Sequence, residues 1–227
     1  MDRLDNTTAH AAADYESEVG RTIPFHALML EQVVDVVLAA CPAPSRWLDT
    51  GCGPSRLAQL ARSRCAAEFL LADPSPAMLV LARARHADLP ADRFLDTPSE
   101  DLPDVAPVQV ITAVQCHHYG DRAARERAVR RCFALLAPGG VFVTFENVRA
   151  ETDAGHALQR ERWLRWLRDQ GRDEASARAH LAREDTKFFP IRVSEHVALL
   201  GRAGFASVEL VWRSYGQAGF CCVKPAP

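Results

Sequence analysis

The amino-acid sequence predicts an α/β fold, in which a mostly parallel, seven-stranded sheet is doubly wound by helices and closed by an antiparallel C-terminal strand. Three observations support this prediction. Short apolar runs alternate with helical segments up to residue 145, a glycine turn follows the first run, and two strand-like runs stand close together near the C-terminus. Alternating strands and helices favour a parallel sheet. Two strands joined by only a few residues are antiparallel neighbours.

The bulk composition is that of a single globular domain. The 227 residues suffice for one α/β domain with a full core, and 48% hydrophobic and 25% charged residues are ordinary values. The net charge of −2 gives no positive field that would favour nucleic acid. The seven cysteines show no repeated CxxC pattern and the N-terminus carries no basic-then-apolar signal, so we expect a reducing, cytoplasmic location. No apolar run reaches about 18 residues, so we expect no membrane partner. We further expect a monomer or homodimer.

The elements of the predicted sheet follow an N-terminal helical segment, residues 1–40. In that segment a helix begins at Tyr15 and is interrupted near Pro24, and a strongly apolar helix covers residues 28–38. Two prolines in residues 41–45 end this helix. The period of the apolar residues then predicts strands at 46–49, 68–72, 93–95, 108–114 and 141–145, with helices at 55–64, 76–87 and 121–136.

Residues 148–187 form an insertion between the fifth strand and the last helix. Two helices are predicted within it, at residues 154–170 and 174–183, and the first combines an apolar face with several arginines. Insertions at the carboxyl ends of parallel strands build ligand sites, so we expect this insertion and residues 1–40 to form a lid. A packing appendage with solvated arginines is the alternative. A helix at 194–203 and strands at 206–214 and 219–223 complete the single domain.

A glycine turn and a later carboxylate predict a site for a nucleoside-containing cofactor. Gly51 and Gly53 follow the first strand, and Asp73 ends the second strand, 20 residues after Gly53. Glycines let a ligand approach the backbone, and a carboxylate at this separation accepts hydrogen bonds from ribose hydroxyls. A dinucleotide-binding dehydrogenase shares such a turn, but it would require a glycine further along and would not explain the closing antiparallel hairpin.

The order of the further motifs resembles that of class I S-adenosylmethionine-dependent methyltransferases. WLDTGCG, LLADPSPAML, SEDLP, QCHHYGD and LLAPGG follow one another before the final two strands, so the resemblance covers residues 46–223. It implies a Rossmann-like fold and S-adenosyl-L-methionine as cofactor. The two ends of the chain look like a subgroup that includes small-molecule methyltransferases and the transfer-RNA wobble carboxymethyluridine enzymes. Ser55 stands where the usual GxGxG motif has its third glycine.

The resemblance implies a cofactor-binding role for each of a set of residues. Asp73 would accept hydrogen bonds from both ribose hydroxyls, and Asp49 would bind backbone groups or the methionyl amino group, with a structural cap of the turn as the alternative. Arg21 would bind the methionyl carboxylate or be an exposed charge, and an aromatic ring at Tyr15 would cover the sulfonium. The implied set is Tyr15, Arg21, Asp49, Gly51, Cys52, Gly53, Asp73, Pro74, Met78, Ser99, Glu100 and Gln115.

Polar residues at two strand ends are candidates for catalysis. His118 follows the fourth strand and is preferred over His117 as a base that removes a proton from the acceptor; a packing role is the alternative for both. Glu146 and Asn147 end the fifth strand and would hold the acceptor in the same crevice. We expect no metal site, because Cys116 and the two histidines have no further evident ligands.

Three aromatic residues of the C-terminal part are candidates for contact with the substrate. Phe188, Trp212 and Tyr215 would surround the acceptor, because aromatic rings suit the neighbourhood of a sulfonium. Each of the three could equally belong to the core.

The predicted function is methyl transfer from S-adenosyl-L-methionine to a small molecule in bacterial secondary metabolism. Transfer is an in-line displacement that depends mainly on placement and desolvation. Two alternatives stay open. The methionyl amine or α-carbon could attack within the cofactor, releasing methylthioadenosine and a small cyclic amino acid. A transfer-RNA-modifying methyltransferase is supported only by the arginines of the insertion. An intact Asp73 and glycine turn disfavour a non-catalytic regulator.

Overall fold

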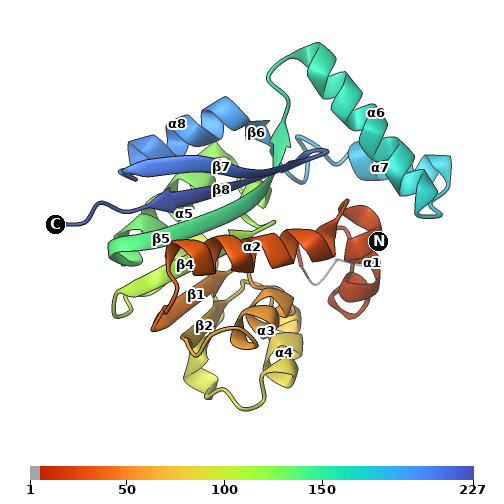
Figure 1. The fold of residues 1–227 in the computed structure, drawn as a ribbon. Helices are drawn as coiled ribbons and strands as arrows, with labels where there is room; N and C mark the ends of the chain where they lie inside the picture. Colours follow the sequence, from red (N-terminus) through yellow and green to blue (C-terminus); the bar gives the residue numbers. More distant parts are fainter. Residues whose placement is uncertain (1–5) are drawn as a thin grey trace.

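The centre of the molecule is an eight-stranded sheet with helices on both faces, as Figure 1 shows for the computed structural model, which describes residues 6–227. Seven strands lie in the order β3-β2-β1-β4-β5-β8-β7, and β6 pairs with the end of β5. Strands β1 to β5 pair in parallel, whereas β8 is antiparallel to both β5 and β7. The predicted fold class is therefore confirmed. The additional strand is β6, whose two residues are too few to produce a periodic pattern in the sequence.

The strands and helices follow the predicted alternation along the chain. The strands are β1 Arg46–Thr50, β2 Glu68–Ala72, β3 Phe94–Leu95, β4 Val108–Val114, β5 Leu136–Arg149, β6 Ile191–Arg192, β7 Ser207–Ser214 and β8 Gln217–Val223. The α-helices are α1 Tyr15–Thr22, α2 His26–Ala40, α3 Arg56–Arg62, α4 Pro76–Arg85, α5 Arg122–Leu135, α6 Asp153–Asp169, α7 Glu174–Leu181 and α8 Val193–Ala203. Short 3-10 turns include η3 Ser99–Asp101 and η4 His117–Tyr119.

Two apolar layers hold the sheet between its helices. Helices α2, α3 and α4 pack on one face, and α5 and α8 pack on the other (Figure 1). Val33, Val34 and Val37 of α2 are fully buried against the sheet. The predicted N-terminal lid of residues 1–40 therefore includes a helix that belongs largely to the core, because the apolar face of α2 is buried on the sheet; only its first turns, at His26, Ala27 and Leu30, line the cavity at the edge of the sheet.

Strand β5 begins earlier than the sequence predicts. Leu136 pairs with Val108, the chain then leaves the sheet around Gly139, and Val141 resumes the pairing with Val110. The proline–glycine segment before Val141, where the sequence predicts no strand, is thus a bulge inside one long strand. Gly139 has φ +72°, and its amide donates to the carbonyl of Lys224 at 3.2 Å, so the bulge is fixed by the C-terminal end of the chain.

Helices α6 and α7 form a satellite beside the sheet with an apolar cluster of their own. Trp163, Leu164, Leu167, Ala177, Leu181 and Phe188 are buried together in it. The satellite contacts α1, since the indole of Trp163 donates to the carbonyl of Thr22 at 2.9 Å and Arg21 donates to the carbonyl of Gln170. Figure 1 shows α1, α6 and α7 gathered at one end of the sheet.

In residues 6–227, no single helix is both long and apolar enough to cross a bilayer. The segments Ala12–Thr22 and His26–Ala40 reach that length and apolarity only together, and they meet at a bend of 91°.

Candidate active site

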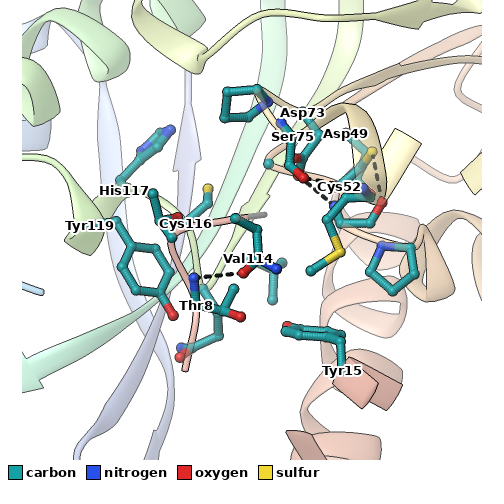
Figure 2. Close-up of a pocket in the computed structure, with 18 of the residues that line it drawn as sticks. Thr8, Tyr15, Asp49, Cys52, Asp73, Ser75, Val114, Cys116, His117 and Tyr119 are labelled. Atoms are coloured by element: carbon teal, nitrogen blue, oxygen red, sulfur yellow. Dashed lines mark hydrogen bonds between the residues drawn. The ribbon is translucent and has the colours of Figure 1, made fainter. Parts of the chain in front are cut away.

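A cavity of about 940 Å³ lies at the carboxyl ends of the parallel strands (Figure 2). Its walls come from the loops that follow β1, β2, β3 and β4, from the first turn of α4, and from α1 and the residues before it. Parallel α/β sheets bind ligands at this edge. Residues of α1 and residues 6–8 cover part of the cavity, which stays open to solvent elsewhere.

The glycine turn after β1 forms one wall of the cavity. Gly51 and Gly53 have φ +63° and +53°, values that favour glycine. A Cβ at Gly51 would lie 2.3 Å from Cβ of Cys116, so a side chain cannot fit there, whereas a Cβ at Gly53 would meet no atom within 4 Å. The backbone at Gly53 is therefore open to a ligand.

Ser55 adopts the conformation that the missing third glycine would have. Its φ is +62°, and it is fully buried. Nε2 of His86 lies 3.2 Å from both the hydroxyl and the carbonyl oxygen of Ser55. These contacts offset part of the cost of a left-handed non-glycine residue, so the turn keeps its shape despite the substitution.

Asp73 joins the two halves of the cofactor cradle. One carboxylate oxygen accepts from the amide of Gly53 at 2.8 Å, and the other accepts from the amide of Ser75 at 2.9 Å. Each oxygen keeps lone pairs for further donors. Burial raises the pKa of Asp73, and the two amide bonds oppose that rise. The geometry fits a carboxylate that receives two neighbouring ribose hydroxyls.

Asp49 is a buried carboxylate with one satisfied oxygen. Thr112 donates its hydroxyl to Oδ1 at 2.7 Å, and Thr112 itself accepts from the indole of Trp47 at 2.9 Å. Within residues 6–227, Oδ2 has no hydrogen-bond partner. Burial raises the pKa of Asp49 to about 7. An unsatisfied buried oxygen at a cavity wall fits a ligand that brings a donor, such as an ammonium group.

Gln115 and Ser99 line the cavity from two other strand ends. Gln115 has φ +55°, and its backbone amide donates to the carbonyl of Phe145 at 2.7 Å. Its side-chain Oε1 has no hydrogen-bond partner in the described chain. Ser99 shares a hydrogen bond of 2.8 Å with the hydroxyl of Thr50. Gln115 thus fixes the loop after β4 against β5, and Ser99 fixes the loop after β3 against the end of β1.

The structure brings most of the predicted cofactor residues together. The cavity is lined by Tyr15, Asp49, Gly51, Cys52, Gly53, Asp73, Pro74, Met78, Ser99, Glu100 and Gln115. Arg21 is outside this lining; its guanidinium donates to the carbonyl of Gln170 and lies 3.6 Å from Glu18. The expectation that Arg21 binds the methionyl carboxylate thus has no support in this geometry, because α1 turns that face toward α6.

The predicted catalytic residues form a polar cluster behind the cavity wall. His118, Glu146 and Asn147 do not line the cavity, and His118 is fully buried. Nδ1 of His118 lies 2.6 Å from Glu146, and Nε2 lies 3.2 Å from the amide nitrogen of Asn147. Both ring nitrogens are therefore occupied, which leaves His118 unable to take a proton from an acceptor in the cavity.

Glu146 holds the turn that follows β4. It accepts from the amides of His117 at 3.1 Å and His118 at 2.9 Å. Burial alone would raise the pKa of Glu146, but the bond to His118 and the nearby histidines lower it to about 2. The carboxylate is thus ionised and structural. His117 lines the cavity, yet its ring packs against Phe142, with centroids 6.2 Å apart.

The three predicted substrate aromatics lie away from the cavity. Phe188 is buried in the α6–α7 cluster, Trp212 packs beside Phe145 at 6.5 Å between ring centroids, and Tyr215 stands at the turn between β7 and β8. These placements match the core alternative for Phe188 and Trp212. The strand end that carries Tyr215 belongs to the antiparallel hairpin and does not point into the parallel-strand crevice.

Several lining residues escaped the sequence prediction. Tyr119, in the motif QCHHYGD, faces the cavity opposite Tyr15 (Figure 2). Its position directly after β4 is the same signal that singled out the histidines. Burial raises the pKa of Tyr119 to about 12, so its hydroxyl is a donor at neutral pH. Arg56, the first residue of α3, lines the cavity directly after the glycine turn. Thr8 and His26 also line it, and no local pattern marks these two, because the N-terminal part of the chain folds over the site from a distance.

Comparison with known families bears on the same part of the chain. Residues 48–140, which contain the strands and loops of the cofactor cradle, match the family model described as a methyltransferase domain.

Two relatives illustrate the range of similar sequences. A carboxy-S-adenosyl-L-methionine synthase of Wolinella succinogenes is 28% identical over 220 residues, which cover 94% of this chain and 90% of that protein. A ubiquinone biosynthesis O-methyltransferase of Cereibacter sphaeroides is 29% identical over 174 residues, which cover 73% of this chain and 60% of that protein.

Solved structures show the same fold. CalS10 from Micromonospora echinaspora, an amino pentose methyltransferase with S-adenosylmethionine bound, superposes with a TM-score of 0.64, 17% identity, and coverage of 96% of this chain and 98% of that one. The N-methyltransferase NodS from Bradyrhizobium japonicum, in complex with S-adenosylhomocysteine, gives a TM-score of 0.63 and 16% identity over 89% of this chain and 88% of its own.

Proposed function

We propose that this chain, which belongs to the class I S-adenosylmethionine-dependent methyltransferases, transfers the methyl group of its cofactor to a small molecule held in the same cavity. S-adenosyl-L-methionine supplies an activated methyl group on a sulfonium. The residues at the carboxyl ends of β1 and β2 would bind the cofactor, with Asp73 on the ribose and the free oxygen of Asp49 on the methionyl ammonium.

The continuity of the cavity carries this proposal. One space of about 940 Å³ includes the cofactor cradle and extends to Tyr15, Tyr119 and residues 6–8. This volume lies near the upper end of small-molecule sites, about 300–1,000 Å³, so a cofactor and a small acceptor could share it. The enclosing α1 and N-terminal residues favour a small acceptor over a nucleic acid, as does the net charge of −2.

The chemistry would depend on placement. The acceptor's nucleophile attacks the methyl carbon as the carbon–sulfur bond breaks, and the bond pair stays on sulfur. The hydroxyl of Tyr119 would donate a hydrogen bond to the acceptor. Burial, with a smaller effect of Arg56, lowers the pKa of His26 to about 4, so this imidazole stays neutral near pH 7 and is a weak base that can accept a hydrogen bond from the acceptor.

A second candidate is a reaction on the cofactor itself. The relative from Wolinella succinogenes is named for the synthesis of a carboxylated S-adenosyl-L-methionine, and its match extends over nine-tenths of both chains. Four further relatives with that name match over at least 94% of this chain. Cyclisation of the cofactor is a separate candidate that these relatives do not support: in a partly covered cavity the methionyl amine or α-carbon could attack its own side chain, with release of methylthioadenosine and a cyclic amino acid.

The nucleoside product distinguishes these reactions. The purified protein is incubated with S-adenosyl-L-methionine alone and then with panels of small amines, phenols and carboxylic acids, and the products are identified by mass spectrometry. S-adenosylhomocysteine that forms only with an acceptor is the expected result. Methylthioadenosine without an acceptor would establish cyclisation instead, and a cofactor heavier by one carboxyl group would establish the carboxylation route. Asp73→Asn protein serves as the control for background decomposition.

A further inference from the structure

A second cleft, of about 280 Å³, opens on the outside of the α1–α2 turn. Its walls come from that turn, from α6 and from the β7–β8 hairpin, and they include Phe25, Leu158, Gln159, Arg162, Arg213 and Tyr215. None of these residues lines the cofactor cavity. His26, the next residue after Phe25, does line it, so a single turn of chain separates the two sites.

Three aromatic rings from distant parts of the sequence meet beside this cleft, and two of them, Phe25 and Tyr215, line it. The ring of Phe25 lies 5.5 Å from that of Trp166 and 6.1 Å from that of Tyr215, and Trp166 and Tyr215 are 5.8 Å apart between centroids. Phe25 nevertheless remains 48% exposed. A ring that is anchored on one side and open on the other can stack against a further planar group.

Two of these aromatic residues have an unfavourable backbone conformation. Phe25 has φ 58° and Tyr215 has φ 46°, both in the left-handed region. Bulky residues avoid this region, and where it persists it concentrates at ligand clamps and other functional sites. The two residues line the same cleft from segments 190 positions apart in the sequence.

Two arginines give the cleft a positive charge, which the more distant carboxylate of Glu151 offsets only in part, at Arg213. The guanidinium carbon of Arg162 lies 4.5 Å above the ring of Tyr215, and Arg213 donates to Oε1 of Gln159 at 3.2 Å. Among residues 6–227, no carboxylate oxygen lies within 4.0 Å of a nitrogen of either arginine. Arg160, on the same helix, is by contrast paired with Glu184.

We propose that this cleft binds a small aromatic acid. The exposed face of Phe25 would receive the planar ring, and the forked guanidinium groups of Arg162 and Arg213 would bind its carboxylate or phosphate. A volume of about 280 Å³ admits one ring with its acid group and excludes a folded or polymeric partner. This site is independent of the reaction proposed for the cofactor cavity.

The test uses 4-fluorophenylacetate as the probe, observed by fluorine NMR with the chain of residues 1–227. We expect saturable line broadening with wild type. The double variant Arg162→Gln/Arg213→Gln should lower the affinity for the probe about tenfold or more, because the charge-assisted hydrogen bonds of the two guanidinium groups are removed. Neutral 4-fluorophenylacetamide should bind more weakly by a similar factor. In a proton–nitrogen spectrum, the indole N–H signal of Trp166, assigned with Trp166→Phe, should shift on binding, and that of Trp47 should not.

Matched variants separate this site from other sources of binding. Arg165→Gln/Arg202→Gln removes the same charge outside the cleft and should leave probe affinity unchanged, as should saturation of the cofactor cavity with S-adenosylhomocysteine. Three results would overturn the proposal: an equal loss of probe affinity in both double variants, displacement of the probe by S-adenosylhomocysteine, or no binding of the probe to wild type. An RNA oligonucleotide that binds through Arg162 and Arg213 while the probe does not would assign the cleft to nucleic acid and equally overturn it.

Discussion

Asp73 has a double role, since its carboxylate both shapes the cradle and remains available to a ligand. Its bonds to the amides of Gly53 and Ser75 connect the loop after β1 with the loop after β2. Asp73→Asn keeps the volume and one acceptor oxygen but loses the charge. We expect the affinity for S-adenosyl-L-methionine to fall by about 10- to 100-fold, since hydrogen bonds to charged groups contribute about 1.5–3 kcal/mol.

Isothermal titration calorimetry measures this change directly. Asp92→Asn is a matched control, because Asp92 is an exposed carboxylate outside the cavity lining. Unchanged affinity in Asp73→Asn would refute the assignment of Asp73 to the ribose.

Asp49 makes the cradle sensitive to pH near neutrality. Burial raises the pKa of this carboxyl to about 7, and only its ionised form attracts an ammonium group. We expect the Kd for S-adenosyl-L-methionine to decrease as the pH rises from about 6 to about 7.5, by up to about eightfold, as the ionised fraction increases. Calorimetric titrations across this range measure the trend. Asp49→Asn should abolish it, and an equal trend in that variant would place the titrating group elsewhere.

Residue-level prediction from sequence succeeded where local chain geometry defines the role. Gly51, Gly53 and Asp73 follow strands directly, so their place at one edge of the sheet follows from the order of elements alone. It failed at His118, because a strand-end position does not tell which of two adjacent histidines faces a cavity. Glu146 decides that question from a different strand, and no local pattern carries this information.

At the scale of elements, the satellite of α6 and α7 restrains the helix that encloses the cavity. The indole of Trp163 donates to the carbonyl of Thr22, and α1 provides Tyr15 and Val19 to the cavity. We expect Trp163→Phe to increase the dissociation rate of S-adenosylhomocysteine about fivefold, since one buried hydrogen bond contributes about 1 kcal/mol.

Stopped-flow displacement measures this rate. Glu161→Gln, an exposed substitution on the same helix, should leave the rate unchanged. A rate in Trp163→Phe equal to that of wild type would show that α6 does not restrain α1, and the insertion would then be a packing appendage.

The pattern of elements was predictable because their periodicity is long and regular, whereas their long-range partners were not. Helices α6 and α7 could be placed in the sequence, but the contact with α1 joins residues 141 positions apart. Strand β5 began five residues early for a related reason. Pairing of Leu136 with Val108 extends the strand through a proline–glycine segment that reads locally as a turn.

For the molecule as a whole, buried histidines limit stability in acid. Burial lowers the pKa of His180 and of His196 to about 3, against about 6.5 in an unfolded chain. Their contribution is complete above pH 6.5 and is lost as the pH falls, because the unfolded chain binds the protons first. We expect each to remove about 2 kcal/mol from the free energy of unfolding between about pH 6.5 and pH 5.

Urea titrations of wild type and His196→Phe test this dependence. Phenylalanine can keep the stacking with Phe220, whose ring lies 5.2 Å from that of His196. The variant should lose less stability than wild type in this acidic interval and follow wild type between about pH 7 and pH 8, where a histidine of ordinary pKa is already neutral. Parallel curves in acid would contradict the assignment.

The contact between Gly51 and Cys116 links two positions that lie 65 residues apart in the sequence. A side chain at either position occupies the space that the other would need, so the two should evolve as a pair. Because the clash is with the Cβ of residue 116, any residue other than glycine at that position excludes a side chain at position 51, and a lineage that loses Gly51 must first have glycine at position 116. Sequence variation at these two sites should therefore be correlated, although neither residue has to touch the acceptor.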